Sequence, residues 1–391
     1  LKNVHVLDGT LAQRADIFTK RDGIFIVNTE SFSHAKFADA VHRKPPTILA
    51  IDESHRCKEP SAKRTKALIK LTHLMEKQPV KHRYLLSGSP VLNSEIDLFS
   101  QFLILDAGKT FGTNFFAFRG TYFQDKNAYM QRHNYFPNWV VRPGALDAIK
   151  EKIEASVVRA DKSECLDLPP LLRMEVEVEL SKEQRKAYEE MKKEFIAFVD
   201  SGVAVANLAI TKALRMQQII SGFLKLDGGE IHYFKDNPRA NALSDLLQDI
   251  VPKEKCIVWS VFHNDHDTVK AILNNLKIGY AEVTGLVKDK QAELDRFEKD
   301  PECRVMISSQ AAGGTGTNMI QASTMIYYSK SFNLADDMQS ESRNFRGGSE
   351  IHDKITRIDL VAKGTVDDIV LTALRSKKDL ASSILELRNL L

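Results

Sequence analysis

Short apolar runs rich in β-branched residues alternate with helical stretches through the first half of the chain. Four of these runs have the length of strands, at residues 4–7, 24–27, 47–51 and 83–87. Helices are expected near residues 61–77 and 93–105. Strands that alternate with helices are typical of a parallel sheet covered by helices. The first half is therefore predicted to be an α/β domain.

The middle of the chain is rich in aromatic residues and ends at a break. From residue 111 to residue 139, Phe, Tyr and Trp occur at irregular spacing among Arg and Lys, a composition that would suit stacking on bases. A helical insertion that packs its own small core is the favoured interpretation. Pro169 and Pro170 then halt any helix, so residues 161–172 are interpreted as a linker.

The second half repeats the α/β alternation. Residues 173–180 alternate apolar and charged side chains, which predicts a half-exposed strand. Ser181 and Gln184 have the spacing of a capping box at the start of a helix. Further strands are expected at residues 256–260, 304–308, 324–328 and 355–361, with a final helix from about residue 366. The predicted domains are residues 1–160 and 173–391, joined by the linker.

Composition narrows the class of protein. A chain of 391 residues suits two domains, and a hydrophobic content of 43% allows each a core. The four cysteines are scattered without a CxxC pair, which argues against a zinc site or a disulfide framework. The longest apolar runs are too short for a membrane span, so no membrane association is expected. A net charge of +3 gives no argument for nucleic acid.

The first candidate motif is Asp52-Glu53-Ser54-His55, which follows the apolar run 48–51. It lies at the carboxyl edge of a parallel sheet, where ligands bind. Asp52 would hold Mg²⁺ through water, and Glu53 would orient and deprotonate the water that attacks ATP. His55 would pass the nucleotide state to the other domain. By itself, an Asp-Glu pair also fits a solvated helix N-terminus.

The second motif is the Ser87-Gly88-Ser89-Pro90 turn, which follows another predicted strand. Its hydroxyl groups and backbone could change partners when a phosphate leaves, which would couple two sites. A simple Gly-Ser-Pro turn explains the same residues equally well.

The third and most informative motif starts where the strand 304–308 runs into a glycine-rich loop. Glycines such as Gly314 and Gly316 let the backbone approach a phosphate closely. Further along, Gln339 precedes Arg343 and Arg346, whose spacing predicts one shared helical face. Two permanently charged forks on one face would clamp a γ-phosphate. By itself, the arginine pair also fits a solvated basic face.

Two further segments resemble ligand-binding motifs but have simpler structural explanations. Gly108-Lys109-Thr110 looks like the end of a phosphate-binding loop, but it follows the Asp-Glu pair and lacks the first glycine of the pattern, so it is interpreted as a turn after a helix. His263-Asn264-Asp265-His266-Asp267 resembles a metal cluster. A helix N-terminus capped by Asp265 explains it better.

In this order, the motifs resemble the superfamily 2 helicase core. Finer details are similar to its Snf2-like branch, and six segments carry that similarity. Residues 52–58 resemble the DEAH box, 85–90 the LTGTP segment and 159–170 the Arg-x-x-Lys-x-x-x-x-x-LP stretch before the second lobe. Residues 214–219 resemble the LRQI helix, 256–262 the IVFSQF strand and 364–367 the closing GT(I/V)D/E segment. The resemblance implies two RecA-like lobes with parallel sheets flanked by helices, plus helical insertions.

The resemblance also implies an ATP-driven motor that uses Mg²⁺ and translocates on or remodels duplex DNA. Asp52, Glu53, His55, Arg343 and Arg346 would be catalytic, and ATP would meet Gln339, Gly314 and Gly316. Contacts to DNA or coupling roles would fall to Lys58, Ser87, Ser89, Ser308 and Asn333.

One departure from the family changes the expected activity. Members carry a GxGKT phosphate loop ahead of the strand that begins this chain, so the first lobe is expected to be incomplete and the chain to hydrolyse little ATP alone. The alternatives are a nucleic-acid-binding module without ATPase activity and, less favoured, an RNA-directed superfamily 2 helicase. A cytoplasmic monomer from a bacterium or a phage-infected cell is expected, with a DNA-bound protein as a further possible substrate.

Overall fold

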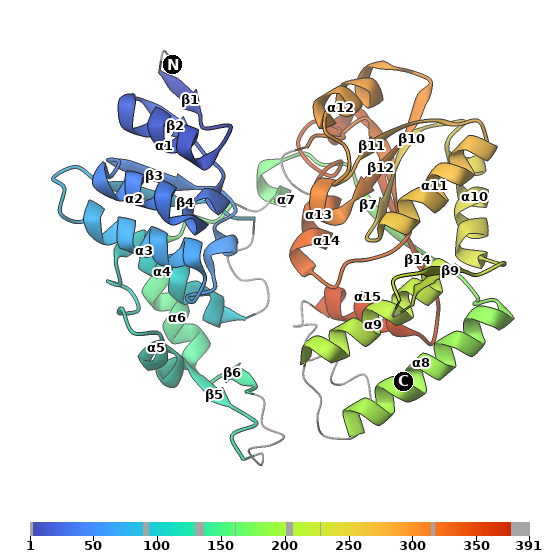
Figure 1. The fold of residues 1–391 in the computed structure, drawn as a ribbon, viewed down its shortest axis with the longest axis horizontal. Helices are drawn as coiled ribbons and strands as arrows, with labels where there is room; N and C mark the ends of the chain where they lie inside the picture. The colour runs from blue at the N-terminus through green and yellow to red at the C-terminus, as the bar shows by residue number, and fades with distance from the viewer. Residues whose placement is uncertain are drawn as a thin grey trace. The chain divides into compact units, whose positions relative to one another are not determined.

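The structure is a computed structural model that describes residues 3–88, 94–129, 137–160, 162–200, 206–226, 228–313 and 317–376. The described residues up to Val158 form one compact unit, and those from Arg159 onward form a second (Figure 1). No helix within these ranges is long and apolar enough to cross a bilayer.

The N-terminal unit is built on two pairs of parallel strands. β1 (Val4–Val6) pairs with β2 (Ile24–Ile26), and β3 (Ile48–Ile51) pairs with β4 (His82–Leu85). The four strands expected here are confirmed, with ends that differ by one or two residues. The helices between and after them are α1 (Leu11–Lys20), η1 (Thr29–Ser33), α2 (Ala35–Arg43), η2 (Ser54–Cys57), α3 (Lys63–Met75), η3 (Glu95–Asp97) and α4 (Leu98–Asp106).

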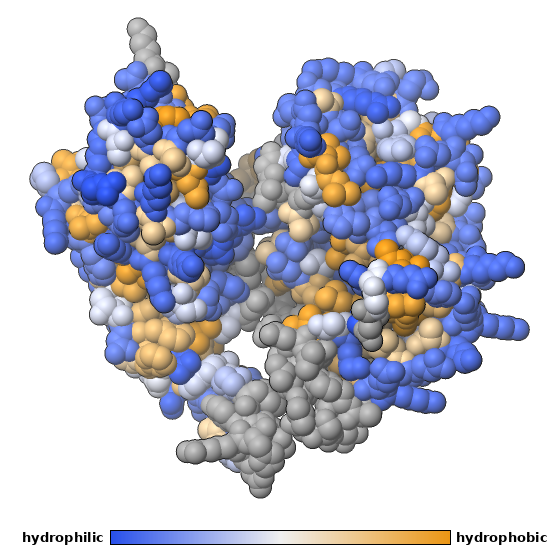
Figure 2. Space-filling model, in the orientation of Figure 1, coloured by the Kyte–Doolittle hydropathy of each residue, from blue (hydrophilic) through white to orange (hydrophobic). Residues whose placement is uncertain are grey.

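The two faces of these strands differ in how they are covered. Phe25, Leu49 and Leu85 pack against a core formed with α1, α2 and α3. The alternate positions are exposed, and their side chains are large and apolar: Val6 is 56% exposed, Ile26 55%, Ile48 59% and Leu86 56%. Orange surface is visible at the β1–β2 end of this unit in Figure 2. Parallel strands are normally buried on both faces, so within the described residues one apolar face lacks its cover.

The aromatic stretch packs into a small core, as predicted, but it shares that core with α4 and α6, which lie outside the stretch. α5 (Phe115–Tyr122) and α6 (Ala145–Ile153) pack with α4 around Phe99, Phe102, Phe118 and Phe123. A hairpin that the sequence did not predict, β5 (Phe123–Asp125) with β6 (Trp139–Val141), closes this core. The Arg119 guanidinium lies 4.0 Å from the centroid of the Trp139 ring, so it stacks within the protein.

The C-terminal unit contains a six-stranded, wholly parallel sheet in the order β11-β12-β10-β13-β14-β7. The strands are β7 (Leu171–Glu177), β10 (Lys255–Ser260), β11 (Gly279–Val283), β12 (Cys303–Ser309), β13 (Ala322–Tyr327) and β14 (Ile355–Val361). The strands expected from residue 256 onward are confirmed, and β11 was missed. The helices are α7 (Lys162–Cys165), α8 (Lys182–Asp200), α9 (Ala206–Ser221), α10 (Pro238–Ile250), α11 (His263–Asn275), α12 (Lys290–Lys299), α13 (Gln310–Gly313), α14 (Leu334–Glu341) and α15 (Val366–Ser376).

Both faces of this sheet are covered. In β10, Cys256 and Val258 point into a core shared with α10 and α11, whereas Ile257 and Trp259 point into a second core shared with α12. All four are fully buried. A strand buried on both faces needs a continuous apolar run, which is why these strands stand out in the sequence.

The predicted linker is partly wrong. Residues 162–165 form α7, and β7 begins at Leu171, where it pairs in parallel with Ile355 at the start of β14. Residues 171 and 172 therefore belong to the sheet. The half-exposed strand expected at 173–180 is confirmed, but it begins two residues earlier because its register is set by pairing with β14.

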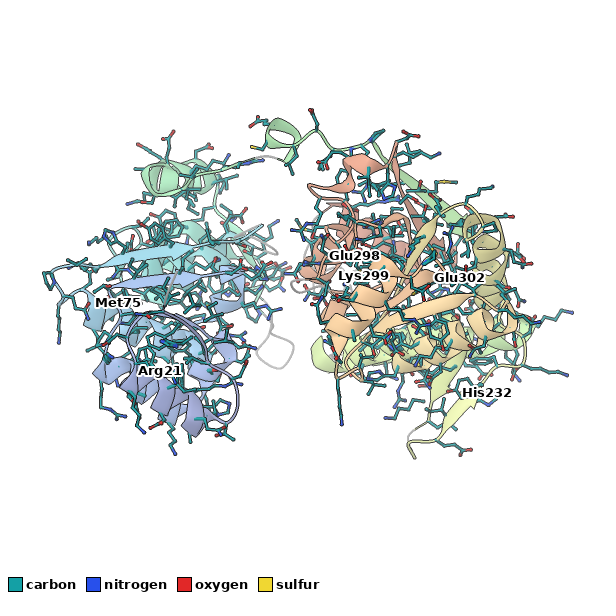
Figure 3. The ribbon with its side chains drawn as sticks, turned by 90° about the horizontal axis from the view of Figure 1, so that it is seen from above. Arg21, Met75, His232, Glu298, Lys299 and Glu302 are labelled. Carbon is teal, nitrogen blue, oxygen red and sulfur yellow. The ribbon has the colours of Figure 1, made fainter. Side chains whose placement is uncertain are left out.

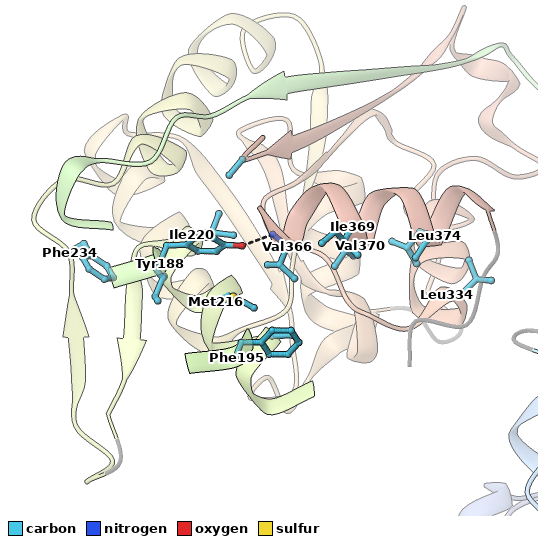
Figure 4. Close-up of a cluster of buried hydrophobic side chains, with 14 residues drawn as sticks. Tyr188, Phe195, Met216, Ile220, Phe234, Leu334, Val366, Ile369, Val370 and Leu374 are labelled. Carbon is cyan, nitrogen blue, oxygen red and sulfur yellow. Dashed lines mark hydrogen bonds between the residues drawn. The ribbon is translucent and has the colours of Figure 1, made fainter. Parts of the chain in front are cut away.

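A third cluster joins α8, α9 and α15 beside the sheet (Figure 4). The capping box at the start of α8 is confirmed. The backbone amide of Gln184 donates to the Ser181 hydroxyl, and the backbone amide of Ser181 donates to Oε1 of the Gln184 side chain. Within the cluster, the buried Tyr188 hydroxyl accepts a hydrogen bond of 2.8 Å from the Val366 amide. This bond ties α8 to the first turn of α15.

Replacing Tyr188 with Phe should destabilise the C-terminal unit. The change leaves the buried Val366 N–H without an acceptor, which costs about 1–3 kcal/mol in free energy of unfolding. Urea unfolding followed by circular dichroism measures it. Tyr233→Phe is the matched control, because Tyr233 is 54% exposed and its hydroxyl bonds only at the surface with Asn264. Equal effects of the two changes would contradict the role assigned to Tyr188.

Candidate functional site

The acidic motif lies where β3 ends. Asp52 is exposed, and its Oδ1 accepts a hydrogen bond of 2.9 Å from the Glu53 amide. Glu53 has a left-handed backbone, with φ of 51° and ψ of 49°. Successive residues of a strand point to opposite faces, and this turn breaks the alternation directly after Asp52. A non-glycine residue in this conformation costs about 1 kcal/mol, so the surrounding contacts must hold it.

Three of the predicted site residues come together at this edge. The Nδ1 atom of the buried His55 lies 3.2 Å from Oε2 of Glu53 and 3.3 Å from Oγ of Ser87. Ser87 belongs to the segment after β4, and the Ser54 amide bonds to the Leu86 carbonyl across the two strand ends. The parallel pairing of β3 and β4 therefore brings the acidic motif and the Ser87 turn side by side. Ser89 lies outside the described residues.

Lys58 is half-exposed and forms an ion pair within the protein. Its Nζ lies 3.0 Å from Oδ2 of the buried Asp97, and a contact of Lys58 with DNA remains a prediction. Gln101 completes the support: it accepts from the Ser54 hydroxyl at 2.9 Å and donates to the Asp97 carbonyl. Sequence reasoning missed Asp97 and Gln101. The available signal was the presence of three polar residues, Asp97, Ser100 and Gln101, in the otherwise apolar segment 96–105.

The Gly108-Lys109-Thr110 segment is confirmed as a turn after a helix. α4 ends at Asp106, whose carboxylate accepts hydrogen bonds from all three amides of the triplet and from the Thr110 hydroxyl. The amides that a phosphate would need are therefore already bonded.

In the C-terminal unit, the strand that leads to the glycine-rich loop is confirmed, and Ser308 lies inside it; its role in DNA contact or coupling remains a prediction. Ser308 is fully buried in β12 and donates to the Val283 carbonyl in β11. Gly314 and Gly316 lie outside the described residues. Sequence reasoning missed the buried Gln310, which follows Ser308 by two residues. Its side chain accepts from the Ser331 amide at 2.7 Å and donates to the Ser340 hydroxyl, which joins the end of β12 to α14.

Asn333 caps α14. Its Oδ1 accepts a hydrogen bond of 2.9 Å from the Ala335 amide, so its side-chain oxygen is used by the helix. Gln339 lies half-buried in the last turn of the same helix. A contact of either side chain with ATP or DNA remains a prediction.

The prediction that Arg343 and Arg346 share one helical face is wrong. α14 ends at Glu341, and a turn follows in which the buried Asn344 side chain donates to the Ala322 carbonyl. Arg343 is buried and donates to the carbonyls of Gln339 and Thr317, at 3.1 and 3.2 Å. Arg346 is exposed, and none of the described side chains bonds its guanidinium. The two arginines therefore have different environments.

A buried charge network fixes α14 on the sheet. The Arg357 guanidinium in β14 bonds both carboxylate oxygens of Asp337, at 2.8 and 3.1 Å, and one of Glu341 at 2.8 Å. It also lies 4.0 Å from the centroid of the Tyr327 ring. Lys330 pairs with Asp359 at 2.8 Å. Bidentate pairs to a planar guanidinium define orientation as well as distance, so this network sets the position from which the chain turns to Arg343.

Comparison with known families identifies the chain. A family model of the SNF2-related domain matches residues 3–227, more than half of the chain, and one of the helicase conserved C-terminal domain matches residues 238–348. The chain belongs to the SNF2-related family. The resemblance drawn from the motifs is confirmed, as is the α/β class with RecA-like parallel strands flanked by helices.

Several individual proteins are similar to this family member. The uncharacterized ATP-dependent helicase MG018 of Mycoplasma genitalium is 27% identical over 241 residues, which cover 61% of this chain and 23% of that protein. The TATA-binding protein-associated factor MOT1 of Saccharomyces cerevisiae is 23% identical over 397 residues, 87% of this chain and 20% of that protein. The chain therefore spans less than a quarter of either relative.

Among solved structures, the Sulfolobus solfataricus SWI2/SNF2 ATPase core in complex with dsDNA is 18% identical. The match covers 99% of this chain and 78% of that one, with a TM-score of 0.47.

The His263–Asp267 segment begins a helix, as expected, but Asp265 is not its cap. Phe262 occupies the cap position, and Asp265 follows in the first turn, where its carboxylate accepts from the Phe262 amide and from the Ser329 hydroxyl. Burial raises the pKa of Asp265 to about 6. Burial also lowers the pKa of the neighbouring His266 to about 4. Both groups are therefore held toward their neutral forms.

These two shifts give stability effects of opposite sign. The contribution of His266 to stability is fully present at pH values above the pKa that His266 has in the unfolded chain. This contribution is lost as the pH falls toward about 4, the pKa in the folded chain. Asp265 stabilises the fold in its protonated form, and this contribution is lost as pH rises through about 6. Between about pH 7 and about pH 5, His266 should lower the free energy of unfolding by about 2 kcal/mol and Asp265 should raise it by about 1 kcal/mol.

Urea unfolding at the two pH values separates the effects. Asp265→Asn should make the loss of stability on acidification steeper than in the parent chain. His266→Gln should reverse it, so that the variant gains stability relative to the parent on acidification. Identical pH slopes in the parent and both variants would show that neither group titrates as described.

Proposed function

We propose that this chain is part of the ATP-hydrolysing motor of an SNF2-related DNA translocase, which uses ATP and Mg²⁺ and acts on duplex DNA. The observation that carries the proposal is the arrangement of Asp52, Glu53, His55 and Ser87 at the carboxyl edge of two parallel strands. This is the edge at which α/β proteins bind ligands. Family membership supports the choice of ATP as that ligand.

Asp52 fits a magnesium ligand. Its carboxylate is exposed directly after the strand, and Mg²⁺ prefers oxygen ligands and keeps several waters. When bound, Mg²⁺ neutralises charge on the phosphates of ATP. Asp52 would hold the ion through water, which leaves the neighbouring carboxylate for a different task.

Glu53 would act as the general base. It is partly exposed, so a water can reach it, and the buried His55 lies within hydrogen-bond distance of Oε2. His55 would orient this carboxylate, and Ser87 would connect its state to the segment after β4. The left-handed backbone of Glu53 turns its side chain out of the strand alternation, which is a geometric requirement for two adjacent carboxylates to serve one ligand.

The two arginines would have separate roles. Arg346 is exposed and presents a permanently charged fork, the group that stabilises charge on a transferring phosphoryl. Arg343 is a positioning residue, because its guanidinium bonds the carbonyls of Gln339 and Thr317 on either side of the turn. Gln339 and the glycine-rich loop would then approach the nucleotide. Contacts to DNA phosphates would make the motor tolerant of sequence.

We infer that the chain alone hydrolyses little ATP. The support is the uncovered apolar face of β1 to β4, where Ile26, Ile48 and Leu86 are each more than half exposed. A parallel sheet in water needs both faces covered, so further polypeptide is expected there. The GxGKT phosphate loop that the sequence lacks would belong to that polypeptide.

Glu53→Gln tests the catalytic assignment. In a form extended with an upstream GxGKT segment, duplex DNA should stimulate ATP hydrolysis, and this change should lower kcat by about 100-fold or more, because general-base catalysis contributes about 10²–10⁴-fold. Steady-state phosphate release measures it. Glu151→Gln is the matched control, since Glu151 is exposed on α6 and far along the chain from the motif.

The outcomes distinguish the alternatives. Brisk hydrolysis by the chain alone would contradict the need for an upstream segment. An extended form that binds duplex DNA but stays inert would favour a nucleic-acid-binding module. Stimulation by RNA in place of duplex DNA would favour an RNA-directed helicase.

A further inference from the structure

The solvent face of α3 carries a stripe of positive charge. Lys63, Lys66 and Lys70 are exposed on α3, and their spacing of three and four residues places them on one helical face. Lys77 is exposed two residues beyond the end of the helix and lines the same hollow as Lys66 and Lys70. His73 is exposed on the same face. α3 ends at Met75, which is labelled in Figure 3. The sequence of the helix contains no Asp or Glu.

The described part of the chain does not use these lysines. Among the described residues, no carboxylate pairs with any of the four. Glu76 follows the helix directly, but it pairs with Arg83, Lys81 and Lys109. Like charges three and four residues apart destabilise a helix. The stripe therefore opposes the stability of α3 and requires another explanation.

Arg64 shows the contrast within the same helix. It lies off the stripe and is bonded to the Glu30 carboxylate and the Arg56 carbonyl. The arginine of α3 is therefore bonded within the protein, whereas the lysines of the stripe are exposed to solvent.

The stripe borders a hollow with an apolar floor. Ile69 and Leu74 are half-buried between the lysines, and together with Lys66, Lys70, His73 and Lys77 they line a hollow of about 340 Å³. This volume lies at the lower end of the roughly 300–1,000 Å³ of ligand pockets. It suits one or two side chains better than an extended ligand.

We infer that this face binds an acidic peptide of a partner protein, with one apolar side chain seated between Ile69 and Leu74 and carboxylates paired with the lysines. Charge complementarity selects the acidic partner, and the apolar floor favours a peptide over a nucleic-acid backbone, which has no apolar group to place there. Phosphate recognition also favours arginine forks, and the only arginine of α3 is bonded elsewhere. With a net charge of +3 on the whole chain, the attraction is local to this face.

The test measures binding of a fluorescent peptide rich in Glu and Asp with one central Leu, by polarisation, to the full chain. Lys66→Gln combined with Lys70→Gln and Lys77→Gln should weaken binding by about tenfold, from the loss of three exposed ion pairs. Replacing the central Leu of the peptide by Ser should weaken binding to the parent chain by about tenfold or more. All three lysines are exposed, so the variant should keep the circular dichroism spectrum of the parent.

The matched control removes the same charge elsewhere in the N-terminal unit. Lys36, Lys150 and Lys152 are exposed on α2 and α6, and changing all three to Gln should leave peptide binding unchanged. An equal loss in this control would overturn the inference in favour of bulk charge. Equal binding of the Leu and Ser peptides would overturn it as well. So would a stripe variant that loses affinity for duplex DNA while its peptide binding is unchanged, since the face would then be a nucleic-acid surface.

Discussion

Parallel strand pairing is the constraint on which the rest of this structure depends. It brings the carboxyl ends of neighbouring strands to one edge, and it requires apolar cover on both faces of the sheet. In the C-terminal unit both requirements are met: Val258 and Trp259 are adjacent in β10 and fully buried in opposite cores. The sheet can therefore hold Gln310, at the end of β12, and the turn after α14 in fixed positions.

The N-terminal unit meets the same constraint on one face only. The covered face supports the acidic motif, because the helices beneath it supply Gln101 to Ser54 and Asp97 to Lys58. The opposite face presents large apolar side chains to solvent. Among the described residues, the acidic edge is therefore supported by packing on one face of its strands only.

Buried polar side chains determine which functional groups face solvent. Arg357 is held by Asp337 and Glu341, and this network positions α14 so that the chain turns at Glu341. The turn buries Arg343 and exposes Arg346. A buried charge is costly unless it is paired, so Arg343 is committed to the carbonyls that surround it, and Arg346 remains available. α3 shows the same separation, since Arg64 is bonded within the fold and its lysines are not.

The sequence by itself determined the α/β class, most strands and the place of the acidic motif, because buried parallel strands need continuous apolar runs and their chemistry follows directly at their ends. It could not give the environments of Lys58, Ser308 and Arg343. Their partners are Asp97, Val283 and Thr317, which lie between 25 and 39 residues away. The prediction that Arg343 and Arg346 share a helical face was wrong because the helix ends at Glu341 and the Asn344 side chain bonds to the Ala322 carbonyl. Only tertiary packing decides which polar side chains form hydrogen bonds within the protein and which remain available to a ligand. Their hydrogen-bond partners are distant in the chain, so sequence spacing does not reveal them.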